Sequence, residues 1–357
     1  MAALTEGQIR LLDFRHDSSD NNIRLKISTH DRAQAPPYTA LSYEGGSWID
    51  LGFVEVNEAT HSVRRNLYNA LAHLPYHMTG PFWVDALCID QENTEERNHQ
   101  VRAMGEIYGG AALVVAWFGL IDNAGRPCFT ATGRESLEVV RAARRALVRK
   151  KYWTRLWVYQ ELILAQEIKV ACGSHHMTHT DLATLLWNVD GEYDAHRICY
   201  AVARGPTYDL CEALAHFSTC KRADGRDRIF AILSIVAADE RETLLTMLPE
   251  YSAVMAHLVE VARVHIRHLR SRGNVSEELV ETALDVLARM RTASLVAPNY
   301  SQGLTLESVR ASKRDMLARA GMGDASLTDQ CSPPAALRVE PERSRSKRPA
   351  EPAFNPG

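Results

Sequence analysis

The chain has 357 residues, with 41 lysines and arginines against 44 aspartates and glutamates, and its formal net charge is −3. At roughly 150 residues per domain, this length predicts two domains, or one large domain with an extension. A hydrophobic fraction of 46% excludes a wholly disordered chain. The slightly acidic balance argues against nucleic-acid binding by bulk positive charge.

Membrane and export signals are missing from the sequence pattern. No apolar run reaches the roughly 18 to 20 residues that span a bilayer, so we expect no contact with a membrane. The first residues lack a basic start followed by an apolar run, as a secretory signal would have. Seven scattered cysteines then predict reduced thiols in an intracellular, cytoplasmic protein.

The first half of the chain alternates strand and helix patterns. Residues 8–30 predict a β-ribbon with a polar turn at 17–22. Runs that are apolar on both faces predict central strands at 82–87 and 113–117. The further expected strands are 38–43, 53–57 and 168–171, and the expected helices are 62–74, 94–108, 141–151 and 152–166. This order predicts an α/β fold with a mostly parallel sheet flanked by helices.

The second half is expected to be mostly helical, with segments at 181–189, 208–219, 226–237, 251–270 and 276–291. Residues 332–357 hold six of the 14 prolines and few large apolar residues, which is typical of disorder. The basic run 343–348 keeps a nuclear location open. We therefore expect an α/β domain at 1–175, a helical region at 176–320 and a disordered tail rich in proline, arginine and serine at 321–357.

Glu161 is the most informative titratable residue. On one continuous helix over 152–166, Trp153, Trp157, Glu161 and Leu164 share a face, which places a carboxylate in line with two tryptophans. Buried glutamates are rare unless they are paired. One interpretation is a buried ion pair with Arg155 or a distant arginine, and the other is an active-site carboxylate in the wall of a pocket.

Other polar residues give weaker signals. Asp85 lies in an apolar stretch near a strand end, where α/β folds gather ligands, but it could equally cap a neighbouring loop. Asp90 fits a turn, and Cys88 fits the core better than a nucleophile. Asn93 and Glu96 have the spacing of a helix N-cap and its reciprocal partner. The spacing of cysteine and histidines in 172–179 lacks the four ligands of a structural zinc, so we expect no metal.

Sequence blocks in a characteristic order resemble the fungal heterokaryon incompatibility (HET) domain family. The most specific block is Trp83–Gln91, followed by Glu96-Arg97 and Gln100-Val101. The other blocks are Tyr38–Tyr43, Val56-Asn57, Asn66-Leu67, Ala70-Leu71, Met104, Ile107-Tyr108, Ala111-Ala112, Trp117–Gly119, Arg155–Glu161, Arg226–Leu233 and Pro249–Ser252. One departure is Tyr43-Glu44-Gly45-Gly46, where the family usually has Tyr-x-Trp-Gly.

The resemblance implies a fold and a chemistry. HET domains are similar to TIR domains, which are flavodoxin-like α/β units, and some TIR domains cleave NAD with a glutamate in a Trp/Cys-x-x-Glu-Leu context. Residues 157–162 resemble that context with one extra residue before Glu161. By this resemblance Glu161 would be catalytic, and Ser42, Tyr43, Asp85 and Trp157 would bind the substrate. NAD would be the substrate, with no cofactor or metal.

Three hypotheses follow for function. The first is a NAD glycohydrolase (NAD nucleosidase) that acts in fungal self/non-self recognition and programmed cell death, in the manner of innate immunity. The second is a non-catalytic TIR-like module that assembles with itself or with a separate sensor protein. The third is a degenerate relative that is retained for another interaction.

Overall fold

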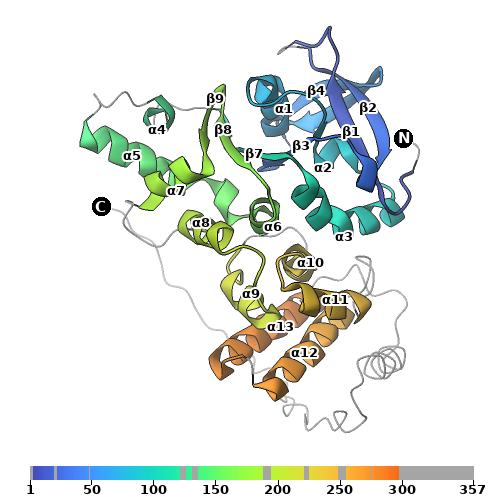
Figure 1. Ribbon diagram of the computed structural model, residues 1–357, viewed down its shortest axis with the longest axis vertical. Helices are drawn as coiled ribbons and strands as arrows, with labels where there is room; N and C mark the ends of the chain where they lie inside the picture. Colours follow the sequence, from blue (N-terminus) through green and yellow to red (C-terminus); the bar gives the residue numbers. More distant parts are fainter. Residues whose placement is uncertain are drawn as a thin grey trace, which may run out of the picture.

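The computed structural model describes residues 3–19, 22–47, 49–120, 126–130, 136–187, 194–220, 225–247, 255–273 and 275–296. Their strands form one nine-stranded sheet in the order β5-β4-β2-β1-β6-β3-β7-β8-β9 (Figure 1). The strands are β1 Gln8–Phe14, β2 Arg24–Asp31, β3 Thr39–Tyr43, β4 Leu51–Val56, β5 Ala59–Arg64, β6 Phe82–Trp83, β7 Leu113–Trp117, β8 Ile168–Cys172 and β9 His175–Thr178.

The sheet is mixed, so the prediction of a mostly parallel sheet was wrong. β2 pairs with β4, β3 with β6 and β7, and β7 with β8 in parallel. β1 pairs with β2 and β6, β4 with β5, and β8 with β9 in antiparallel fashion. Three of these antiparallel pairs are hairpins whose short connections leave no room for the crossover that a parallel pair needs. The α/β class itself is confirmed.

The four strands joined by parallel pairing in the centre of the sheet have a doubly wound order. Numbered along the chain from β3, the order β6-β3-β7-β8 is second, first, third, fourth. This is how the flavodoxin-like order 2-1-3-4-5 begins. The chain leaves β3 for β6 on one side and later returns to β7 on the other, so the strand order reverses between β3 and β7. In such sheets, ligands bind beside the carboxyl ends of the strands at this reversal.

Helices cover the sheet and build the second half of the chain. In the view of Figure 1, α1 lies above β3 and α3 lies below it, while α9, α12 and α13 pack together farther down. The helices are α1 Arg65–His73, α2 Asp85–Cys88, α3 Thr94–Gly110, α4 Pro127–Thr130, α5 Leu137–Val148, α6 Trp157–Ile163, α7 His179–Trp187, α8 Asp194–Arg204, α9 Leu210–His216, α10 Asp227–Leu233, α11 Ala238–Met247, α12 Met255–Arg272 and α13 Glu277–Val296. Short 3-10 turns lie at Arg32–Gln34, Leu74–Tyr76 and Lys151–Thr154.

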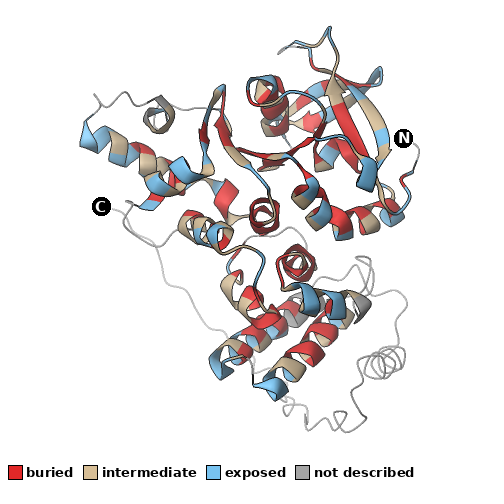
Figure 2. Ribbon diagram, viewed as in Figure 1, coloured by how far each residue is buried: buried red, intermediate tan, exposed pale blue. Residues whose placement is uncertain are grey.

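Two short helices connect the sheet to the helical half. α6 packs against β7, α3, α8 and α10. Every residue of α10, and every residue of α6 after its first, is buried, so both helices appear almost wholly red in Figure 2. A seven-residue helix is too short to be stable alone in water. Tertiary packing on all sides therefore fixes α6, and with it the position of Glu161.

The helix expected at 62–74 begins only at Arg65. Residues 59–64 pair with β4 instead, and Val56 lies opposite Ala59 across a two-residue turn. Asn57 and Glu58 in that turn both have positive φ angles, 47° and 68°. This is the pattern of a type I′ hairpin, for which Asn-Gly is the usual signal. Because Asn57 is followed by Glu58 instead of glycine, the sequence pattern did not predict the hairpin.

Two other expected elements are shorter than predicted. The strand expected at 82–87 ends at Trp83, and the chain then turns into α2. The helix expected over 152–166 is two pieces, a 3-10 turn over Lys151–Thr154 and α6, separated by the extended backbone of Arg155. Trp153 is therefore not on the helix of Glu161, so the predicted shared face was wrong. Its indole donates to the carbonyl of Leu147 at 2.8 Å.

The expected helices of the second half are present, and α8 and α11 add to them. The division into domains at 1–175 and 176–320 stays a prediction. The tail expected at 321–357 lies outside the described residues.

Gly105 provides a test of the contact between α3 and α10. A Cβ atom at Gly105 would lie 2.2 Å from Oγ and 2.5 Å from Cβ of Ser234, whereas one at Gly109 would meet only ordinary contacts. We expect Gly105→Ala to destabilise the protein by about 1–3 kcal/mol through overpacking. Gly109→Ala, its matched control, should stabilise it by about 0.5–1 kcal/mol. Urea denaturation of both variants measures this, and equal effects would contradict the close packing.

Candidate functional site

A cluster of polar side chains lies where the strand order reverses. Tyr43 ends β3 and is in register with Trp117, which ends the neighbouring β7. Ser42 precedes Tyr43, Asp85 follows β6 as the first residue of α2, and Glu161 comes from α6. The carboxyl ends of the central strands thus carry the polar groups that a ligand at this position would meet.

Glu161 is a buried carboxylate with few partners. The side chain is 3% exposed, Ser42 Oγ donates to its Oε2, and Nη2 of Arg155 lies 3.8 Å from its Oε1. Burial raises the pKa of Glu161 above its ordinary value; Arg155 and Ser42 counteract this, and the charge of Asp85 adds to it. Among the described residues, Oε1 accepts no hydrogen bond, so it keeps acceptor capacity in a solvent-poor place.

Two hydroxyl groups lead to this carboxylate. Tyr152 Oη and Ser42 Oγ are 2.6 Å apart, and both side chains are buried. Ser42 gives its only hydroxyl proton to Glu161, so Tyr152 must donate to Ser42. Burial first, and then the charge of Glu161, raise the pKa of Tyr152, which keeps the phenol protonated as that donor. The order Tyr152, Ser42, Glu161 fixes one oxygen of the carboxylate.

Tyr43 and Arg155 connect the cluster to its outer side. Tyr43 Oη donates to Oδ1 of Asp85 at 3.1 Å, and Nη1 of Arg155 donates to the carbonyl of Tyr43. Burial raises the pKa of Tyr43 well above its usual range, and Asp85 raises it further. The Arg155 side chain is 25% exposed and Asp85 is half-buried, so these two residues form the solvent side of the cluster.

The structure brings together four of the five residues singled out from the sequence. Ser42 and Glu161 are in direct contact, Tyr43 contacts Asp85, and Arg155 joins the two pairs. Trp157 begins α6, is half-buried and packs against the core, and no hydrogen bond or ion pair among the described residues joins it to the Glu161 carboxylate. The catalytic and binding roles of all five residues stay predictions.

The ion-pair interpretation of Glu161 is visible in the geometry, and the active-site interpretation stays a prediction. The ion pair with Arg155 exists, but at 3.8 Å it lacks a hydrogen bond. The extended backbone at Arg155, which breaks the expected helix, lets this side chain reach Tyr43 as well as Glu161.

Three aromatic residues near the cluster were not recognised from the sequence. Tyr152 bonds to Ser42, Tyr108 Oη donates to the carbonyl of Leu41 at 3.2 Å, and Trp83 lies edge-on to Tyr108 at 5.4 Å between ring centres. Burial is the main cause that raises the pKa of Tyr108, and the charge of Glu161 is the next largest. Trp83 and Tyr108 were noted only within blocks of the family resemblance, and Tyr152 was given no site role. Only their partners in the fold place the three residues near the cluster.

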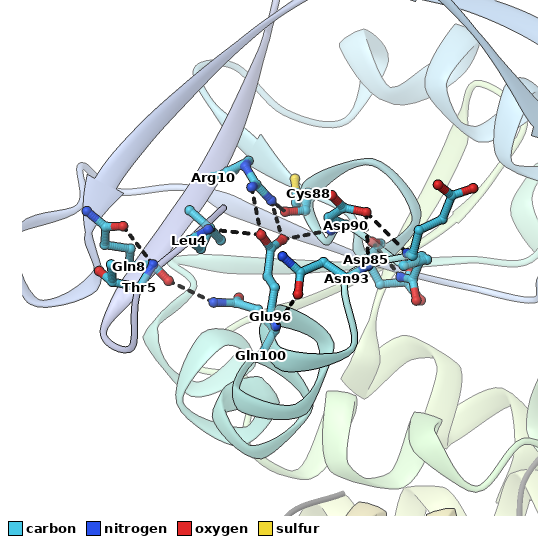
Figure 3. Close-up of polar contacts among 12 residues, drawn as sticks. Leu4, Thr5, Gln8, Arg10, Asp85, Cys88, Asp90, Asn93, Glu96 and Gln100 are labelled. Atoms are coloured by element: carbon cyan, nitrogen blue, oxygen red, sulfur yellow. Dashed lines mark hydrogen bonds and ion pairs between the residues drawn. The ribbon is translucent and has the colours of Figure 1, made fainter. Parts of the chain in front are cut away.

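Glu96 is a second buried carboxylate, and its environment is the opposite of that of Glu161. Arg10 donates to both of its oxygens, and the backbone N–H groups of Leu4 and Asp90 donate at 2.9 and 2.7 Å (Figure 3). Burial opposes ionisation, but these donors outweigh it and lower the pKa of Glu96 to about 2. A carboxylate with all its acceptor sites filled is a structural element rather than a ligand-binding group.

The predicted cap at the start of α3 is half confirmed. The side chain of Asn93 accepts from the backbone N–H of Glu96 at 3.1 Å, as expected. The reciprocal bond from the Glu96 carboxylate is replaced by the contacts with Arg10. Cys88 is fully buried with its pKa raised to about 12, which fits the core thiol expected there. Among the described residues, no three His, Cys, Asp or Glu side chains gather as a metal site.

Comparisons with known proteins place these residues in a family. Residues 38–161, which include all the residues of the cluster, match the family model described as heterokaryon incompatibility protein (HET). Residues 38–161 are thus the part of the chain that is similar to the HET family. The HET match ends at Glu161 itself and begins one residue before β3. The cluster's residues thus lie within the matched range.

One curated relative is similar to part of this chain. Heterokaryon incompatibility protein 6, OR allele, from Neurospora crassa is 30% identical over 150 residues, which cover 37% of this chain and 22% of the relative. The chain thus matches less than a quarter of the length of that protein. No solved structure matches. Within the described part of the chain, no helix has the length and apolar character needed to cross a membrane.

Proposed function

We propose that this protein is a NAD glycohydrolase that acts in incompatibility-type cell-death signalling, with Glu161 as its catalytic carboxylate. The observation that carries the proposal is the state of Glu161: buried, with a raised pKa, and with one oxygen unoccupied by donors among the described residues. Strongly perturbed carboxylates with unused acceptor sites concentrate at functional sites.

The position in the sheet supports the same proposal. Nucleotide ligands of doubly wound sheets bind beside the reversal of strand order, and Tyr43, Asp85 and Glu161 lie at that reversal. The order β6-β3-β7-β8 is also compatible with a TIR-like arrangement. The relative named as a heterokaryon incompatibility protein supports the biological role proposed here.

The chemistry requires a carboxylate and little else from the protein. Cleavage of the bond between ribose C1′ and the nicotinamide nitrogen sends the electron pair to the ring, which leaves as neutral nicotinamide. Positive charge develops on the ribose, and a fixed carboxylate in a dry site stabilises that oxocarbenium-like state. Water then adds at C1′, and its proton passes to Glu161 and on to solvent. The products are ADP-ribose, nicotinamide and a proton.

The neighbouring residues have matching roles in this proposal. Ser42 and Tyr152 hold Oε2, which leaves Oε1 to face the ribose. Tyr43, Asp85 and Trp157 would contact the substrate, the aromatic rings by stacking on a flat base. Arg155 favours the ionised form of Glu161, because its charge lowers the pKa of that carboxyl. A raised pKa suits a group that accepts a proton from water near neutral pH.

The test is nicotinamide release from NAD by the full chain. Chromatography should detect nicotinamide and ADP-ribose in equal amounts with the wild type, and Glu161→Ala should abolish release. Glu167→Ala is the matched control, because Glu167 is an exposed carboxylate six residues away. No release at high protein concentration, or equal release by the two variants, would reject Glu161 as the catalyst.

A non-catalytic assembly module is the second candidate. Two large apolar side chains four residues apart, one just before β4 and one on it, are exposed: Ile49 is 96% and Phe53 65% exposed. Exposed apolar groups of this size can mark contact surfaces. Concentration-dependent light scattering by the wild type, lost in Phe53→Ser, together with no nicotinamide release, would favour this function.

A further inference from the structure

The segment 84–93 carries Asp85 but contains little regular structure of its own. α2 is a single turn of four residues, Asp85–Cys88, and Val84 provides no side-chain cap for it. A helix this short is not stable alone in water. Contacts with other parts of the chain must therefore hold Asp85 where Tyr43 Oη can donate to it.

Two of those contacts are made by the two partners of one ion pair, Arg10 and Glu96, which lie on different elements. Arg10 on β1 donates to the carbonyl of Cys88 at 2.9 Å, at the end of α2. Glu96 on α3 accepts from the N–H of Asp90 at 2.7 Å, two residues farther on. Arg10 and Glu96 bind each other through both oxygens of the carboxylate, and the Arg10 side chain is 2% exposed (Figure 3).

The rest of the segment folds back on itself from these two points. Gln91 Nε2 donates to the carbonyl of Asp85 at 3.2 Å, and Asp90 Oδ1 accepts from the N–H of Glu92 at 3.1 Å. Figure 3 shows Asp85 beside this turn, on the side away from Arg10. A displacement of Cys88 or Asp90 would therefore be passed to Asp85 through one turn of helix.

We propose that the Arg10–Glu96 pair positions the Asp85 side of the site: it fixes segment 84–93 at Cys88 and Asp90, and so holds Asp85 against Tyr43. Arg10 and Glu96 are positioning residues, since neither belongs to the cluster around Glu161. The inference rests on the proposed function only for its effect on turnover. Its structural part concerns this chain alone.

The decisive variant is the double substitution Arg10→Met/Glu96→Leu. Replacing a buried ion pair by apolar side chains of similar volume is often neutral for stability, so the fold should persist. The contacts to Cys88 and Asp90 are lost, however. We expect an unchanged thermal midpoint, faster amide exchange in peptides covering 84–93, and nicotinamide release lowered about 100-fold, as a misplacement of about 1 Å can cause.

Matched variants separate positioning from simple stability. Arg204→Met/Glu212→Leu removes another two-bond arginine–glutamate pair, in the helical half, and should leave exchange in 84–93 and turnover unchanged. Arg10→Lys keeps the charge but, with a single nitrogen, loses the two-oxygen contact with Glu96 that the guanidinium makes. It should fold and exchange faster in 84–93, which keeps the test decisive if the double variant is unstable.

The outcomes are distinguishable. If the double variant retains both slow exchange in 84–93 and full turnover, the pair only stabilises the fold and the proposal is overturned. If the wild type releases no nicotinamide, the proposed function fails, and exchange in 84–93 alone decides whether the pair positions the segment. Slow amide exchange in segment 84–93, both in Arg10→Lys and in any folded double variant, would overturn the positioning proposal.

Discussion

Glu161→Gln is expected to lower nicotinamide release by about 10²–10⁴-fold, the usual contribution of a catalytic carboxylate. Glutamine has nearly the same shape and can still accept from Ser42, so the cluster should keep its geometry. It cannot carry the negative charge that the ribose cation requires or accept a proton from water. Unchanged release in this variant would contradict the proposed mechanism.

The same variant should change how stability depends on pH. The folded-state pKa of Glu161 is raised above its ordinary value of 4.5, so the folded protein keeps a proton that the unfolded chain loses as the pH rises past 4.5. The wild type therefore loses stability as the pH rises from there through the folded-state pKa. Glutamine does not titrate, so Glu161→Gln should gain stability relative to the wild type over that window. Urea denaturation between pH 4 and 9 measures the difference, and a flat difference would contradict the raised pKa.

Glu96→Gln should have the largest effect on stability. Removing one partner of a buried ion pair leaves the guanidinium of Arg10 uncompensated and costs about 3–5 kcal/mol at neutral pH. The pKa of Glu96 is lowered to about 2, from an ordinary value of 4.5. The stability that its charge supplies is therefore present above pH 4.5 and is lost as the pH falls to 2.

The Glu96→Gln and Glu161→Gln variants serve as controls for each other, because their effects on stability should change with pH in opposite directions. The destabilisation by Glu96→Gln should shrink on acidification below pH 4.5, whereas the relative gain of Glu161→Gln should grow on raising the pH. Parallel denaturation series on both variants measure the two slopes. Slopes of the same sign would mean that the two carboxylates do not differ as their contacts indicate.

The sequence predicts the central part of this fold well, because its apolar runs are long. Leu113–Trp117 has no polar residue and became a central strand, and the alternation in 23–27 became part of the ribbon β1–β2. The local sequence pattern predicted the wrong secondary structure where tertiary contacts determine the backbone conformation. The Asn57-Glu58 hairpin and the extended Arg155 contradict the helical periodicity around them, because pairing with β4 and contact with Tyr43 are more favourable there.

The candidate site was predictable only in part for a similar reason. Ser42, Tyr43, Asp85 and Glu161 were found through the family resemblance and the oddity of a carboxylate in an apolar stretch. Tyr152 gave no signal, since its hydroxyl finds Ser42 110 positions away in the chain. Glu96 suggested a cap, because nothing in the sequence links it to Arg10, 86 residues before it. Partner choice over such distances is a property of the fold.

The margins of the sheet bear on how copies of this chain could associate. β5 at one edge has six residues with Thr60 and Ser62 exposed, and β9 at the other has only four, with His176 and Thr178 exposed. Short polar edge strands offer few free backbone groups to an incoming strand. The addition of strands from other copies of the chain at these edges is therefore disfavoured. We expect any filament or oligomer of this protein to be built through side-chain surfaces rather than by extending the sheet from one copy to the next.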